Sequence, residues 1–266
     1  MRRAEHEPGG FRPYPAGGRM LVASQAALRR SIDVTTEFAG FSRDAIQFLA
    51  DLALHNDRSW FQPRKGDYER LLKEPLAALC AALGERFESA GLPLRADAKS
   101  PFRIYRDVRF SADKSPYKTA ASASFPWAGE GGGVGAYFHF QPGEMFAGGG
   151  MWHPEPAQLA GWRRAVDTDP GTVAAALESP EFASMFGRVS GDSLKRVPSG
   201  FAADHPGADL LKLKDVTFGR HLSDEDVLSR GLPDVLVSTF AASIPVLRLL
   251  ASLSPGEVRA GWLRGA

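Results

Sequence analysis

The sequence predicts an α+β fold, in which an antiparallel sheet of about five strands packs with helices from both ends of the chain. Apolar residues recur at helical spacing before residue 92 and again after residue 155, and this spacing gives a helix one buried face. The segment between them alternates instead, with turn signals at intervals typical of an antiparallel meander. Because these strands follow one another directly, a parallel sheet of β-α-β units is excluded.

The first helix is predicted to begin after Ser42, whose hydroxyl can accept an unpaired amide hydrogen of the first turn. Its buried stripe comprises Ile46, Leu49, Leu52 and Ala53. A second helical stretch follows Pro63 and is expected to stop near Gly91. Pro75 lies inside this stretch and predicts a kink or a break in the helix.

The strands are predicted at residues 101–110, 117–126, 135–141, 144–151 and 215–222. Pro142 and Gly143 mark a tight turn, and this pair suits a type II turn better than the primed hairpin turns.

Three consecutive glycines, Gly148 to Gly150, fall where a strand is expected, although glycine weakens a strand. They indicate a bulge, or a surface that another backbone or a ligand approaches closely. We favour close packing, because the aromatic neighbours Phe146 and Trp152 can use the space.

Helices return after the sheet. Pro156, Pro170 and Pro180 are first-turn prolines, the last two preceded by the capping residues Asp169 and Ser179. A further helix is predicted to begin with a capping box at residues 223–226. The longest apolar run, residues 232–253, contains charged residues and two prolines, so it predicts a buried helix of a soluble protein and not a membrane span.

Composition indicates an ordinary globular protein, with 44% hydrophobic and 24% charged residues and a formal net charge of +1. Residues 1–38 are rich in proline and glycine and are predicted to form a disordered extension, followed by a single α+β domain over 39–254 and a tail over 255–266. The one cysteine excludes an internal disulfide, and no apolar signal segment follows Arg2 and Arg3, so we expect a cytoplasmic protein.

One stretch, residues 101–119, concentrates cations in a nearly neutral chain. It carries five basic residues and two acids, which are Arg103, Arg106, Arg109, Lys114 and Lys118, and Asp107 and Asp113. The aromatic residues Tyr105, Phe110 and Tyr117 are interleaved with them. In an extended strand Arg106 shares a face with the apolar Ile104 and Val108. It therefore needs a partner, which is either a carboxylate of the protein or a bound anion.

Three functions are compatible with this stretch. The first is a site for an anionic or phosphate-bearing small molecule, with ligand contacts from Arg103, Tyr105, Arg106, Arg109, Lys114, Tyr117 and Lys118. The second is an enzyme that uses Asp107 or Asp113 as acid or base, and the third is a structural or interaction protein without a ligand. Nothing predicts a cofactor, metal or membrane partner, the pI near 7.9 makes nucleic acid an unexpected partner, and the oligomeric state is open.

The sequence RIYRDVRFSADKSPYKT resembles the signature of a family of uncharacterised bacterial and fungal proteins, domain-of-unknown-function family 2461. The resemblance extends upstream to FLADLALHNDRSWFQPRKGDYERL and downstream through GGGMW and LKRVPSGFAADHP, over roughly residues 40–254. It implies a single domain of mixed α and β structure. It implies no activity, cofactor or ligand, and it transfers no catalytic residue.

Overall fold

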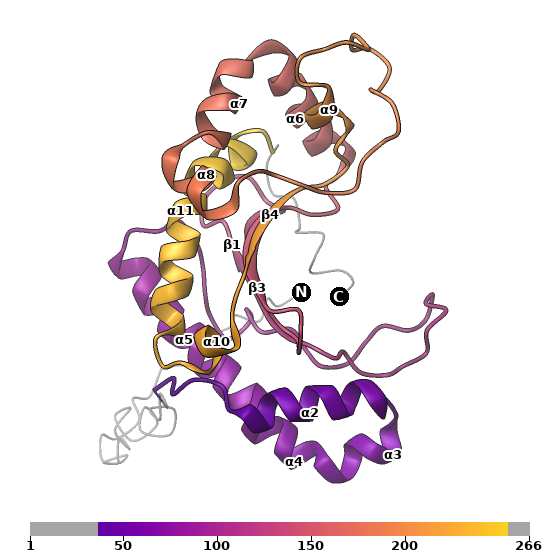
Figure 1. The fold of residues 1–266 in the computed structure, drawn as a ribbon, viewed down its shortest axis with the longest axis vertical. Helices are drawn as coiled ribbons and strands as arrows, with labels where there is room; N and C mark the ends of the chain where they lie inside the picture. The colour runs from indigo at the N-terminus through magenta and orange to yellow at the C-terminus, as the bar shows by residue number, and fades with distance from the viewer. Residues whose placement is uncertain (1–36, 255–266) are drawn as a thin grey trace, which may run out of the picture. The chain divides into compact units, whose positions relative to one another are not determined.

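The computed structural model describes residues 37–254, which have an α+β fold around one open antiparallel sheet (Figure 1). The fold class is confirmed, whereas the predicted number of about five strands is corrected to four. Residues 1–36 of the extension predicted at 1–38, and the whole tail predicted at 255–266, lie outside the described residues. Phe38, at the end of the predicted extension, is buried against Phe41.

The strands follow chain order across the sheet: β1 (Ala121–Pro126), β2 (Val134–Phe140), β3 (Phe146–Met151) and β4 (Val216–His221). The helices before the sheet are α2 (Arg43–Leu54), α3 (Arg58–Phe61), η2 (Gln62–Arg64), α4 (Lys65–Tyr68), η3 (Glu69–Lys73) and α5 (Glu74–Ser89). Those between β3 and β4 are α6 (Pro156–Thr168), α7 (Pro170–Leu177), α8 (Pro180–Phe186) and α9 (Ala208–Lys212). The chain continues after β4 with α10 (Asp224–Leu228) and α11 (Leu232–Ser252).

The strand predicted at residues 101–110 is not a strand. This segment runs antiparallel to the residues around β1, and the amide of Phe102 donates to the carbonyl of Ser122 at 2.9 Å. Further along, the amide of Lys118 donates to the carbonyl of Ile104 at 2.7 Å. These two hydrogen bonds belong to different registers, because extra residues before β1 bulge out of the pairing. Only isolated bridges therefore remain, such as the one between Tyr105 and Tyr117.

Local signals at the helix ends have the predicted effects in most cases. The Ser42 hydroxyl accepts the amide hydrogen of Ala45 at 3.2 Å, and Ser223 forms a capping box with Asp226. Ser179 is an exception, because its hydroxyl makes no capping hydrogen bond. Pro75 lies in the first turn of α5, directly after the wide π-helical turn η3, so the predicted break takes the form of a change of helix type.

The turn between β2 and β3 is of the predicted kind. The amide of Glu144 donates to the carbonyl of Gln141 at 2.9 Å, and Gly143 has φ of 80°, as the third residue of a type II turn requires.

Within residues 37–254, helices cover one face of the sheet and none covers the other. Helix α11 packs on β3 and β2, α8 packs on β4 and α5 packs on β1, as the left side of Figure 1 shows. Side chains such as Phe125, Phe138 and Phe240 fill this layer and are fully buried. In the part of the chain that the structure describes, α11 has the length and hydropathy of a membrane span, but 56% of its most apolar stretch is buried inside the protein.

The backbones of β2, β3 and β4 approach one another at the glycine run. A Cβ at Gly148 would overlap the carbonyl oxygen of Phe218, and one at Gly149 would lie 2.5 Å from the carbonyl oxygen of Gly135. Gly150 has φ of 124°, which other residues rarely adopt. The register of β3 against both neighbours is unbroken, so the glycines serve close approach and form no bulge.

We predict that Gly148→Ala lowers the free energy of unfolding by about 2 kcal/mol or more, because the new methyl group collides with the backbone of β4. Gly219, its cross-strand partner, is the matched control, since a Cβ there meets only ordinary contacts from 3.6 Å. Urea unfolding of both variants measures the difference, and equal stability of the two would contradict this account of the glycine run.

Candidate functional site

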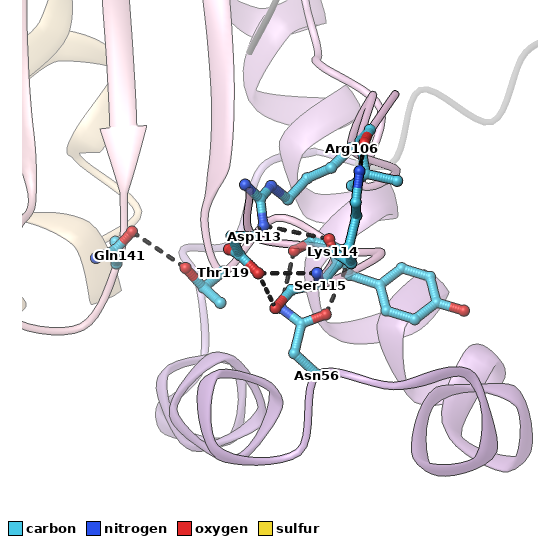
Figure 2. A network of polar contacts seen from close by, with 9 residues as sticks. Asn56, Arg106, Asp113, Lys114, Ser115, Thr119 and Gln141 are labelled. Carbon is cyan, nitrogen blue, oxygen red and sulfur yellow. Dashed lines mark hydrogen bonds and ion pairs between the residues drawn. The ribbon is translucent and has the colours of Figure 1, made fainter. Parts of the chain in front are cut away.

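The basic stretch forms an irregular hairpin at the β1 edge of the sheet, and an asparagine from the helices before the sheet holds its returning arm. The Asn56 side chain donates to the carbonyl of Tyr117 at 2.8 Å and accepts the amide hydrogen of the same residue at 3.0 Å (Figure 2). This pairing connects the α2–α3 corner to the hairpin. It also fixes the backbone position of the next residue, Lys118.

Most of the basic side chains of the hairpin contact acceptor groups of the hairpin itself. The Arg106 guanidinium is partly buried, forms an ion pair with Asp113, and donates to the carbonyl of Ser115 at 3.2 Å (Figure 2). Arg109 makes a two-point contact with Asp107, with N···O distances of 2.6 and 2.9 Å. The partner that Arg106 requires is therefore a carboxylate of the protein.

The Lys114 ammonium is also engaged within the hairpin, because it donates to the carbonyl of Val108 at 2.9 Å. At the tip, Phe110 is 95% exposed and packs on no apolar layer.

The carboxyl groups of the two aspartates in the hairpin have lowered pKa values. Hydrogen bonds from Arg109 lower the pKa of Asp107 to about 2, and hydrogen bonds from Ser115 and Arg106 lower the pKa of Asp113 to about 2. A general acid or base works best with a pKa near the working pH, so neither carboxyl group is suited to proton transfer at neutral pH. Both carboxylates instead hold the loop.

The two tyrosines differ in access. Tyr117 is only 1% exposed and its ring stacks on Phe61 at a centroid distance of 4.0 Å, so it belongs to the core and has no open face for a ligand. Tyr105 packs at an angle on Tyr117 and keeps 46% of its surface exposed.

Among the predicted cations in the described residues, only Arg106 and Arg109 form ion pairs with carboxylates. Lys114 donates to a backbone carbonyl, and Arg103 and Lys118 form no ion pair. The Lys118 Nζ lies 5.0 Å from the centroid of the Phe102 ring. Burial lowers the pKa of Lys118 to about 8, and the nearby charge of Arg103 adds to the shift. Two cations therefore stand close together at one edge of the sheet, where an anion would be favourable.

The uncovered face of the sheet bears a cavity of about 680 Å³, a size typical of small-molecule sites. Its floor includes the backbones of Gly149, Gly150 and Gly219, which project no side chains over the sheet. Its walls are largely aromatic and come from Phe102, Tyr137, Phe146 and Trp152. Phe102 thus belongs both to the cavity wall and to the contact with Lys118.

Polar residues also line this cavity, and they are Tyr137, His139, Gln141, Glu144, Ser190, Thr217, Arg220 and His221. Tyr137 and His139 point to the same face of β2, and the Tyr137 hydroxyl lies 3.0 Å from Nδ1 of His139. Burial lowers the pKa of His139, against the opposing effects of Glu144 and Gln141, so the imidazole is neutral at neutral pH. Its Nε2 is buried without a hydrogen-bond partner among the described residues.

Arg220 borders the cavity through its backbone. Its place in β4 directs the side chain to the helix-covered face, where Nη1 lies 3.6 Å from the sulfur of Met185 and Nη2 lies 3.8 Å from Asp226. The cations nearest the cavity edge at Phe102 are consequently those of the basic hairpin.

Sequence reasoning located the hairpin but missed the cavity. The glycine run was a usable signal, because it predicted a close approach in the middle of a strand. Tyr137 and His139 gave no signal, since their alternation is that of any strand with one partly exposed face.

Residues 44–248 match the model of DUF2461, a family described as a conserved hypothetical protein. The chain belongs to this family. The match runs from the start of α2 into α11, so the DUF2461 region includes the hairpin and the cavity together. Comparisons with the curated proteins and with the solved structures find no match.

We predict that Asn56→Ala destabilises this DUF2461 protein by about 1–3 kcal/mol, because the substitution leaves two partly buried backbone groups of Tyr117 unpaired. Thermal and urea unfolding measure the loss. Gln47→Ala is the control, since that side chain bonds only to Asp51 on the surface of α2. A loss no larger than that of the control would contradict the proposed attachment of the hairpin.

We further predict that Asp107 and Asp113 stay ionised at about pH 3, where an unperturbed aspartate is mostly protonated. Because their pKa values are lower in the folded protein, both carboxylates stabilise it above about pH 4, and this contribution disappears as the pH falls towards 2. NMR titration of the side-chain carboxyl carbons measures the midpoints. Midpoints near 4 would show that the loop ion pairs do not persist in solution.

Proposed function

We propose that the protein binds a small organic anion, whose apolar body occupies the cavity on the open face of the sheet and whose charged group lies at the Phe102 edge. The observation that carries this proposal is that an aromatic cavity of about 680 Å³ meets Lys118 at the Phe102 ring, beside the charge of Arg103, and that neither cation forms an ion pair among the described residues. The ligand is still the anion predicted from the sequence, but most of it lies in the cavity and not on the hairpin.

The shape of the cavity supports a flat and elongated ligand. The cavity extends from Phe102, outside β1, to Gly219 on β4. Neighbouring strands are about 4.8 Å apart, so the cavity spans on the order of 15 Å across the sheet. A floor without side chains lets a flat body lie directly against the backbone, and aromatic walls favour contact with ring faces or edges.

The charged edge supports an anionic group on that ligand. Arg103 and Lys118 raise each other's free energy by charge repulsion, and a bound carboxylate, sulfonate or phosphate would relieve it. Arg103 supplies a planar guanidinium and Lys118 a point charge, a combination suited to oxyanions. Arg106 and Arg109 are less suited, because Asp113 and Asp107 already neutralise them.

Polar groups in the cavity support ligand binding independently. A buried Nε2 of His139 without a partner is costly, by about 1–3 kcal/mol, and a ligand or a water molecule would remove this cost. A neutral imidazole that accepts a hydrogen bond from Tyr137 at Nδ1 donates one from Nε2.

We propose that the protein acts in the cytoplasm, because its one cysteine cannot form an internal disulfide. The single cysteine, Cys80, is buried in α5, and burial raises the pKa of its thiol to about 12, so the thiol is an unreactive packing group.

We predict that anilinonaphthalene sulfonate, a flat apolar anion, binds the native protein and that Gly219→Leu weakens this binding at least about tenfold by filling the cavity. Gly66→Leu is the matched control, because a Cβ there meets no atom within 4 Å in the exposed helix α4. Isothermal titration measures the affinity. Equal binding by the two variants would exclude the cavity as the site.

The pH dependence of the same binding tests the charged edge. Because the pKa of Lys118 is about 8, the ammonium is present below this pH and is lost above it. The affinity for the sulfonate should therefore fall as the pH rises from 7 to 9, with proton uptake on binding near pH 8. Lys118→Met should bind more weakly and without this dependence, and an unchanged pH profile in that variant would separate Lys118 from the anion.

A further inference from the structure

We propose that Lys118 is a nucleophilic amine that condenses with an aldehyde or ketone group to form an imine at the Phe102 edge of the cavity. This goes beyond the proposed function, which needs only the charge of Lys118. The substrate class is a carbonyl compound that also carries an anionic group, so that Arg103 holds the anion while the amine meets the carbonyl carbon.

The first argument is the contact environment of Lys118. Its Nζ lies over the Phe102 ring, 5.0 Å from the centroid, and makes no hydrogen bond or ion pair with the described residues. Lys114 and Lys212 differ, because the first donates to the carbonyl of Val108 at 2.9 Å and the second pairs with Asp209 at 2.7 Å. The lone pair of a neutral Lys118 amine is therefore not engaged by the protein.

The second argument is electrostatic. A lysine becomes a nucleophile when desolvation or a neighbouring cation favours the neutral amine, and Lys118 has both. With a pKa of about 8, roughly a tenth of the side chain is the free amine at neutral pH, whereas an ordinary lysine has less than about a thousandth.

The third argument is position. The pairing of Asn56 with Tyr117 fixes the backbone directly before Lys118, and the amide of Lys118 itself donates to the carbonyl of Ile104 at 2.7 Å. The next residue, Thr119, has its hydroxyl 3.5 Å from the side-chain oxygen of Gln141, which lines the cavity (Figure 2). The amine is thus carried by a braced segment at the cavity edge and not by the exposed loop tip.

The reaction balances without an oxidant or reductant. The nitrogen lone pair attacks the carbonyl carbon, and a proton moves from nitrogen to oxygen to give a carbinolamine. The carbon–oxygen bond then breaks, the second amine hydrogen leaves, and the oxygen departs as water. The product is a carbon–nitrogen double bond to Lys118, and it returns to amine and carbonyl on addition of water.

The test uses pyridoxal phosphate, a flat aromatic aldehyde with an anionic group, followed by borohydride reduction and peptide mass mapping. We expect Lys118 to be modified at least about tenfold more than Lys114, because the Lys118 amine has a pKa of about 8 and no hydrogen bond, whereas Lys114 donates to the carbonyl of Val108. Lys118→Arg should abolish the modification while keeping the charge, and Lys114→Arg should leave it unchanged. Equal modification of the two lysines would overturn the proposal.

A second measurement needs neither a folded variant nor cavity binding. Reductive methylation of the wild-type protein with formaldehyde, at several pH values, should give Lys118 a midpoint near 8. A Lys118 midpoint above 10 would overturn the proposal.

The two proposals fail in different ways. If anilinonaphthalene sulfonate does not bind but Lys118 reacts selectively with formaldehyde, the proposed function fails and the reactive amine stands. If the sulfonate binds and Lys118 reacts no faster than Lys114, the reactive amine fails alone. Protection of Lys118 by the sulfonate, together with reduced pyridoxal phosphate labelling in Gly219→Leu, would support both.

Discussion

The close approach of three strand backbones at the glycine run is the constraint on which the rest of the structure depends. Any side chain at Gly148 or Gly150 would collide with β4, so the centre of the sheet carries no Cβ atoms there. One face of this sheet packs under α11, α8 and α5, which stabilises it through buried aromatic side chains. On the other face the same absence of side chains produces the floor of the cavity. A single backbone requirement thus underlies both the packing of the sheet and its hollow face.

The charged hairpin has a supporting role that its composition does not reveal. Arg106 and Arg109 are neutralised by aspartates within the hairpin, and Asn56 fixes it to the helices that precede the sheet. These contacts hold Lys118 against Phe102, at the edge of the cavity. The charge excess that first distinguishes this stretch therefore has two parts: most of it stabilises a loop, and the remainder faces a place where an anionic molecule is favourable.

Features that depend on contacts between residues close in the chain could be predicted from the sequence, whereas features that depend on contacts between distant residues could not. Helix starts such as those at Ser42 and Ser223 were predicted because a cap is satisfied within four residues. The prediction of a strand at residues 101–110 is wrong because the register changes at a bulge near β1, and the alternation of side chains does not reveal that bulge. Tyr117 is predicted as a ligand contact because it lies among the cations of the stretch. Its ring is buried by Phe61, which lies on a distant helix, and the local sequence does not reveal that contact. The cavity was not predictable, since it depends on which face of the sheet the helices leave uncovered.

The attachment of Asn56 to Tyr117 also has a consequence for folding. The two residues are 61 positions apart in the chain, so their contact closes a long loop and pays its entropy before the hairpin gains any stability from it. From this entropy cost we expect contacts of this kind to form after local helices and neighbouring strand pairs. The environment of Lys118, and with it the chemistry assigned to that amine, is therefore a property of the completed fold and is absent from a chain in which the α2–α3 corner has not yet docked.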